Sequence, residues 1–163
     1  MIAALLLALA ADALPARIPN PGFERGMEGW SGFGHRGFGA YVAHDYRTPR
    51  SHWLNAGWAA RNASPPEAEY RIATRIDARN YRGRRVRVSA ATRAPEFAHR
   101  SASLFADAGA ARAETRIDAS ETWRRHGLDL AVPRDARVIE IGFRIEGTSG
   151  QLEADDVRLE IVR

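Results

Sequence analysis

Apolar and polar residues alternate along much of the chain beyond residue 69. Every second position of the first such segment is filled by Tyr70, Ile72, Thr74 and Ile76. The same period of two recurs over 86–90, 128–132 and 139–145. Successive side chains of a β-strand point to opposite faces, so this pattern predicts half-buried strands. No segment after residue 14 carries an apolar stripe of helical spacing long enough to predict a helix.

Turn signals separate these segments at intervals of roughly 8 to 12 residues, which is typical of a two-sheet sandwich. We expect Asn80–Gly83 to turn the chain and Gly147–Gly150 to close a hairpin onto the last strand. The Ala94-Pro95 pair is expected to end the strand that begins near Arg85, because proline cannot donate to a ladder. The glycine-dense stretch Trp30–Gly39 is expected to form bulges and tight turns. The fold class predicted is all-β: a two-sheet antiparallel sandwich.

The last predicted strand, Leu152–Val162, begins close to two consecutive acids. At period two, Asp155 shares a face with Val157, and that face is otherwise apolar. A carboxylate beside a core must be hydrogen-bonded, paired or metal-bound, because desolvating it alone costs several kcal/mol. We expect its partner at the other end of the chain, in the segment Asn20–Glu24.

The chain carries a formal net charge of +4, and all 24 of its basic residues other than histidine are arginine. An anionic partner would explain this charge, and so would arginines on solvated faces beside the 20 acids. Four of them, on the outward faces of two strands predicted to be adjacent, would form a basic stripe: Arg71, Arg75, Arg85 and Arg87. Intervening acids at Glu69, Asp77 and Glu140 argue against nucleic acid as the partner.

The first 13 residues read as a secretory signal peptide. Ile2–Ala11 is apolar, and Ala11-Asp12-Ala13 is a small-x-small cleavage pattern. The apolar run is shorter than the roughly 20 residues of a membrane span, and a buried first helix is the alternative. The chain has no cysteine, so disulfides and thiolate metal sites are excluded. We therefore expect one domain over 14–163 in a secreted or periplasmic protein.

Several segments together resemble the galactose-binding-like jelly roll, the scaffold of many carbohydrate-binding modules. The resemblance is carried by the opening 20–24 with Gly29-Trp30, the middle 76–78 and 81–90, and the close 123–125, 132–136 and 155–159. It implies a jelly-roll fold and says little about the ligand.

The resemblance also implies a structural calcium ion that joins the first and last strands. Family members use the Glu of the opening motif and an Asp of the closing strand, which fall here on Glu24 and Asp155. Calcium takes six to eight oxygen ligands, and backbone carbonyls would supply others. The alternative is that backbone amides or an arginine satisfy Asp155 without a metal.

A glycan site needs flat aromatic rings and a few polar groups. Candidates gather between residues 41 and 58, and the predicted ligand-binding residues are Tyr46, Arg50, Trp58 and His44. For the remaining tryptophans we expect Trp30 in the core and Trp123 at an edge. Trp53, next to Leu54, is open between core and surface.

The sequence thus predicts a non-catalytic module that binds a polysaccharide or cell-envelope glycan. The alternative is a structural or protein-interaction sandwich with no glycan ligand. Catalysis is not expected, because His44-Asp45 would suit a general base but has no identifiable nucleophile beside it.

Overall fold

The computed structural model describes residues 13–34, 38–45, 51–58, 69–98, 101–147 and 149–162. These residues form β1 (Ser31–Gly34), β2 (Phe38–His44), β3 (His52–Trp58), β4 (Glu69–Asp77), β5 (Arg85–Ala98), β6 (Ala102–Asp107), β7 (Arg112–Ile117), β8 (Ser120–Ala131), β9 (Val138–Glu146) and β10 (Ser149–Ile161). A single 3-10 turn, Ala78–Asn80, follows β4. None of the described helical segments is long and apolar enough to cross a membrane.

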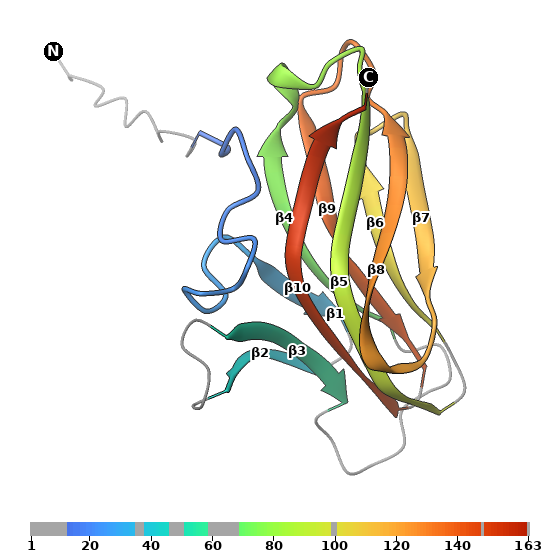
Figure 1. Ribbon diagram of the computed structural model, residues 1–163. Helices are drawn as coiled ribbons and strands as arrows, with labels where there is room; N and C mark the ends of the chain where they lie inside the picture. Colours follow the sequence, from blue (N-terminus) through green and yellow to red (C-terminus); the bar gives the residue numbers. More distant parts are fainter. Residues whose placement is uncertain are drawn as a thin grey trace, which may run out of the picture.

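The strands form two antiparallel sheets that pack face to face. One sheet has the order β1-β4-β9-β6-β7, here called the first sheet, and the second has the order β2-β3-β10-β5-β8. In Figure 1 the strands β10, β5 and β8 of the second sheet lie in front of the first sheet, and the β2–β3 pair extends to one side. The predicted all-β sandwich is confirmed.

The alternating pattern fills the space between the sheets. Ile72 on β4 lies opposite Phe143 on β9, and both are fully buried. The second sheet adds Val88 and Leu152, which are also 0% exposed. Burying each such side chain contributes about 1.5–3 kcal/mol, which accounts for the strict period of two along these strands.

Two predictions about connections are wrong. Gly147–Gly150 does not close a hairpin, because β9 pairs with β4 and β6 whereas β10 pairs with β3 and β5. The chain crosses from one sheet to the other at this point, and it does so again after β4. Consequently β4 and β5 are not neighbours, and their four arginines lie on outer faces of opposite sheets rather than in one basic stripe.

Two local predictions are also corrected. β5 continues through Ala94-Pro95 to Ala98. Pro95 lies where the register between β5 and β10 shifts, so its missing N–H costs no ladder bond. Glycine-rich Ser31–Gly34 is a strand, not a turn: a Cβ at Gly34 would lie 2.3 Å from the backbone carbonyl oxygen of Glu69, so glycine is needed where β1 approaches β4.

Candidate functional site

A row of side chains crosses the outer face of the second sheet. Tyr41 on β2 lies opposite Asn55 on β3, and Asn55 lies opposite Glu153 on β10. Glu153 lies opposite Arg93 on β5, whose guanidinium is 5.5 Å from the ring centroid of Trp123 on β8. We call these five residues the transverse row.

The row faces away from the core. The neighbours of its members along the strands, such as Leu54 and Ala154, are 0% exposed and point between the sheets. Because strand side chains alternate, the row points to the outer face. It crosses all five strands, so four inter-strand steps separate its ends, about 19 Å. That length suits an extended ligand better than a single ring.

The row has an exposed aromatic ring at each end and fixed polar groups between them. Tyr41 is 60% and Trp123 41% exposed, whereas Asn55 and Glu153 are only 7% and 4% exposed. Aromatic faces stack on apolar ring faces, and buried polar groups with fixed geometry supply specificity. Exposed rings that flank fixed polar groups can hold an extended ligand with both apolar and polar surfaces.

Hydrogen bonds hold the middle of the row in place. Nε of Arg93 donates to Oε2 of Glu153 at 2.5 Å, and the side-chain amide of Gln151 donates to Oε1 at 3.0 Å. The ion pair is partly buried, since the side chain of Arg93 is 33% exposed and that of Glu153 is 6% exposed. Both oxygens of Glu153 are therefore occupied, and the spare N–H groups of Arg93 and the amide of Asn55 are the polar groups nearest the rings.

None of the sequence-predicted ligand residues belongs to this row. Tyr46 and Arg50 lie outside the described residues. Trp58 ends β3, but its side chain lies outside the described part as well. His44 is three positions from Tyr41 on β2, so it points to the other face of the sheet.

No member of the row was among the predicted ligand-binding residues, although Tyr41 lies in the range 41–58 from which the candidates were drawn. Trp123 was expected at an edge, and β8 is indeed the edge strand that carries it. Asn55, Arg93 and Glu153 carry no local signal, because a polar residue between two apolar ones is ordinary in a strand. Trp53 is half-buried, and its buried indole N–H has no acceptor among the described residues.

A second feature is the junction between the opening segment and β10. The N–H of Val157 donates to the carbonyl of Pro21 at 3.0 Å, so the two ends of the chain are neighbours as predicted. Asn20, Phe23 and Asp156 all have left-handed backbones, with φ of 44°, 54° and 47°. Left-handed non-glycine residues are uncommon and gather at functional or tightly constrained sites.

The predicted facing of Asp155 is wrong. A register shift between Asp155 and Arg158 marks a β-bulge, and the left-handed Asp156 lies within it. The extra residue breaks the period of two, so Asp155 falls on the face of Arg158 while Val157 turns to the core. Asp155 is half-buried at this bulge rather than in line with the apolar face.

Glu24 lies at the same junction and contacts the imidazole of His52. Nδ1 of His52 is 2.7 Å from Oε2 of Glu24, and the His52 ring stacks on His44 with centroids 5.4 Å apart. The histidine predicted to bind ligand thus belongs to a chain of contacts that ends on Glu24.

The donor chemistry at this junction fits a hard cation. A Cβ built on Gly22 would lie 3.6 Å from Oδ1 of Asp155 and 3.9 Å from Cγ of Glu24, so both carboxylate side chains flank one glycine. Burial, and then the charges of Asp156 and Glu24, raise the pKa of Asp155. In the described part of the chain no group of three or more His, Cys, Asp or Glu side chains converges, so further ligands would be backbone carbonyls or water.

Asp156 differs from its neighbour. It pairs with Arg158 at 2.6 Å and with Arg125, and the hydrogen bond from Arg158 is the main reason that the pKa of Asp156 lies below its ordinary value. Its carboxylate is thus paired with two arginines. Asp155 instead accepts a hydrogen bond from the backbone N–H of Asp156 at 2.6 Å, which satisfies one of its oxygens as the alternative without a metal predicts.

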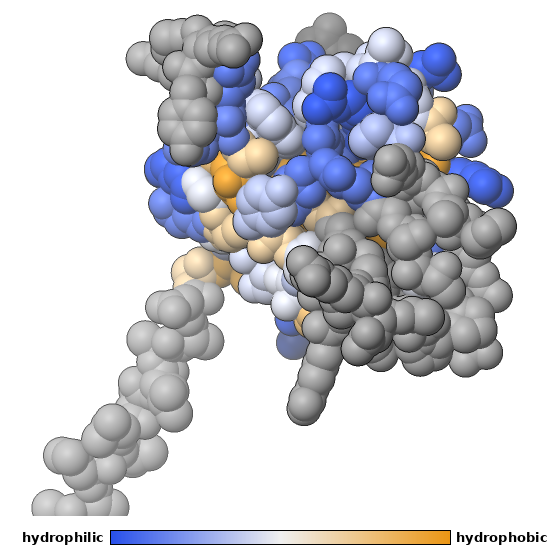
Figure 2. Space-filling model, turned by 90° about the horizontal axis from the view of Figure 1, so that it is seen from below, coloured by the Kyte–Doolittle hydropathy of each residue, from blue (hydrophilic) through white to orange (hydrophobic). Residues whose placement is uncertain are grey.

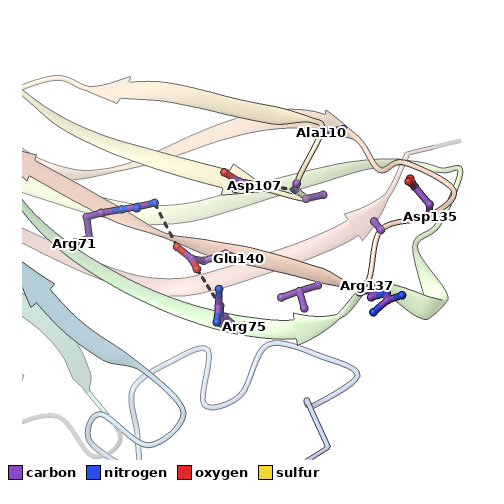
Figure 3. Close-up of a pocket in the computed structure, with 11 residues that line it drawn as sticks. Arg71, Arg75, Asp107, Ala110, Asp135, Arg137 and Glu140 are labelled. Carbon is purple, nitrogen blue, oxygen red and sulfur yellow. Dashed lines mark hydrogen bonds and ion pairs between the residues drawn. The ribbon is translucent and has the colours of Figure 1, made fainter.

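A third feature is a cavity of about 500 Å³ at one end of the first sheet. Figure 3 shows Glu140 between Arg71 and Arg75, with Asp107, Asp135 and Arg137 around the opening. Three acids and three arginines line this cavity, so their charges balance. Figure 2 shows the opposite end of the molecule, seen from below, where most of the described surface is hydrophilic, with small hydrophobic patches.

No family model matches the chain, and no curated protein matches its sequence. Solved structures do match. The enzymatically active domain of tailspike protein 4 of bacteriophage CBA120 has a TM-score of 0.68 at 14% identity, over 90% of this chain and 22% of that one. The chain therefore spans about a fifth of the tailspike chain. Two carbohydrate-binding modules match along nearly their whole length.

TmCBM61, solved with beta-1,4-galactotriose, has a TM-score of 0.58 at 15% identity, over 90% of this chain and 99% of that one. Family 16 Carbohydrate Binding Module-2 has a TM-score of 0.61 at 12% identity, over 87% and 97%. The chain has the jelly-roll fold of carbohydrate-binding modules. At these identities the likeness establishes the fold, and the site must be argued from its own residues.

Proposed function

We propose that the chain is a non-catalytic module of an exported protein that binds a polysaccharide or cell-envelope glycan along the transverse row. The observation that carries the proposal is the pair of exposed rings, Tyr41 and Trp123, at the ends of a row whose middle is polar and fixed. The fold shared with carbohydrate-binding modules supports it. In this role Tyr41 and Trp123 stack on sugar faces, while Asn55 and Arg93 bond to hydroxyls.

The first prediction concerns the two rings. Trp123→Ala and Tyr41→Ala are each expected to weaken glycan binding about tenfold, because each removes an exposed stacking surface. A glycan array on the wild type identifies a ligand, and titration calorimetry on the variants measures the loss. Ile161→Ala is the control, because Ile161 is 44% exposed on the same sheet but lies off the row.

Wild-type affinity in both ring variants would contradict the assignment of the face. A wild type that binds no polymer on the array would contradict glycan binding altogether and favour a protein partner for the sandwich.

Calcium at the junction of the chain ends is a further part of the proposal. Glu24, Asp155 and backbone carbonyls would hold the ion, and their oxygens are the ligands that it prefers. The ion would neutralise both carboxylates, including Asp155, whose pKa the charge of Glu24 helps to raise, and it would tie the opening segment to β10. Its role would be structural.

The second prediction tests this ion with Asp155→Asn. The pKa of Asp155 is raised in the folded chain, so ionising it opposes folding. That cost is absent when the pH is below the ordinary pKa of an aspartate. It grows as the pH rises from this ordinary pKa to the folded pKa, and it is complete above the folded pKa. Without calcium at neutral pH, the variant is therefore expected to melt slightly above the wild type.

With calcium the order is expected to reverse. The wild type gains stability as RT ln(1 + [L]/Kd), whereas the variant, which lacks one charged ligand, gains little. Melting curves in calcium and in chelator measure both effects. Glu160→Gln, an exposed acid on the same strand, is the control and should respond to calcium as the wild type does. Equal responses of wild type and Asp155→Asn would contradict the assignment.

A further inference from the structure

The outer face of the first sheet, opposite the transverse row, carries two arginines that share one acid. Nη2 of Arg71 donates to Oε1 of Glu140 at 3.3 Å, and Nε of Arg75 donates to Oε2 of Glu140 at 3.0 Å. The two arginines lie on β4 and the acid on the neighbouring β9 (Figure 3). One carboxylate thus serves two guanidinium groups.

Arg71 is held from both sides by aromatic rings. Its guanidinium carbon is 4.4 Å from the centroid of Phe105 and 5.5 Å from that of Phe33. Phe105 is 0% exposed although it points outward, because Arg71 covers it. Cation–π contacts of this kind fix the orientation of a guanidinium group. Its buried Nε–H has no hydrogen-bond acceptor among the described residues.

Arg75, unlike Arg71, is exposed enough to bind a ligand. Its side chain is 66% exposed, compared with 24% for Arg71 and 19% for Glu140. Only its Nε is engaged with Glu140, so its terminal N–H groups face solvent. Phe33, at 45% exposed, also presents ring surface to solvent.

These groups also line a second cavity of about 620 Å³, which shares Arg71, Arg75 and Glu140 with the charge-balanced one. Its lining includes Leu14, Phe33, Ala73, Arg71, Arg75 and Glu140. The volume lies in the roughly 300–1,000 Å³ range of small-ligand sites. Two guanidinium groups and one carboxylate belong to the lining, and Glu69, outside it, pairs with Arg71 at 3.9 Å. The exposed terminal N–H groups of Arg75 are therefore the donors that this site offers to a ligand, next to an apolar ring. The ligand that complements this site is a ring that bears a single negative charge.

We infer that this cavity binds a hexuronate, a sugar ring that carries one carboxylate. Phe33 stacks on the ring, Arg75 donates to the carboxylate, and Arg71 acts as a positioning residue that holds Glu140 and Phe33. The choice of a sugar as the ring rests on the proposed function. The cavity lies on the opposite sheet from the transverse row. The chain would therefore contact a glycan on two faces and recognise an acidic sugar on one of them.

Titration calorimetry with trigalacturonate and with its methyl ester tests the inference, because the two differ only in the charge of the carboxyl groups. It is done on a Tyr41→Ala, Trp123→Ala double variant, in which the transverse row is disabled. Trigalacturonate is expected to bind about tenfold more tightly than the ester. Adding Arg75→Gln should bring that ratio close to one.

Arg112→Gln is the matched control, because Arg112 is 47% exposed on the far strand of the same sheet and should leave the ratio unchanged. Adding Phe33→Ala should weaken both ligands. A ratio that survives Arg75→Gln, an equal loss in Arg112→Gln, or no binding by the double variant would overturn the inference. The glycan array and the single ring variants decide the transverse row separately, so the two proposals fail independently.

Discussion

Replacing Phe23 with alanine is expected to lower the free energy of unfolding by about 3–5 kcal/mol. Phe23 belongs to the opening segment, outside every strand, yet it is fully buried. Its ring centroid lies 5.1 Å from that of Trp30, and Trp30 lies 6.4 Å from Phe143 on β9. Removing the ring leaves a cavity between the opening segment and the central strands, which the neighbouring rings cannot fill.

Chemical denaturation of Phe23→Ala at neutral pH measures this loss. Phe33→Ala is the control, because Phe33 is exposed and its removal costs at most one surface cation–π contact, about 1 kcal/mol. Equal midpoints for the two variants would show that the opening segment contributes little to the core. The calcium proposal would then also weaken, since it requires this segment to be docked.

Gly142→Ala is expected to cost about 3 kcal/mol, although it adds one methyl group. Gly142 lies on β9, and a Cβ there would be 2.1 Å from the carbonyl oxygen of Ile72 and 2.8 Å from Cα of Ala73. These are backbone atoms of β4, so no side chain can rotate away. The central strand pair would have to separate, which strains its ladder on both sides.

A second strand glycine provides the matched control. At Gly127 on β8 the same methyl group would meet the carbonyl oxygen of Val88 at 3.4 Å and Cβ of Ser89 at 3.5 Å, which are ordinary contacts. Gly127→Ala should be neutral or slightly stabilising, because alanine loses less conformational freedom on folding. Thermal melting should show a fall of roughly 6–12 °C for Gly142→Ala. A similar change in both variants would contradict the close approach of β9 to β4.

The candidate site was less accessible to sequence reasoning than the fold. Tyr41 and Trp123 are 82 positions apart in numbering and join one row only because β2, β3, β10, β5 and β8 pair in that order. The polar residues between them alternate with core residues as any outward position would. Similarly, the shared acid Glu140 meets Arg71 and Arg75 through the β4–β9 pairing, which no local pattern encodes.

The local pattern by itself determined the strands with strict alternation, such as Glu69–Asp77, and the core positions of Phe143 and Trp30. It also contained no helical spacing and so predicted no helix. These follow from burial, which acts on each position separately. Only the tertiary structure decided the sheet to which each strand belongs, the bulge that turns Asp155 away from Val157, and the continuation of β5 past Pro95. These depend on register between segments far apart in the chain, because a one-residue shift moves every side chain to the opposite face.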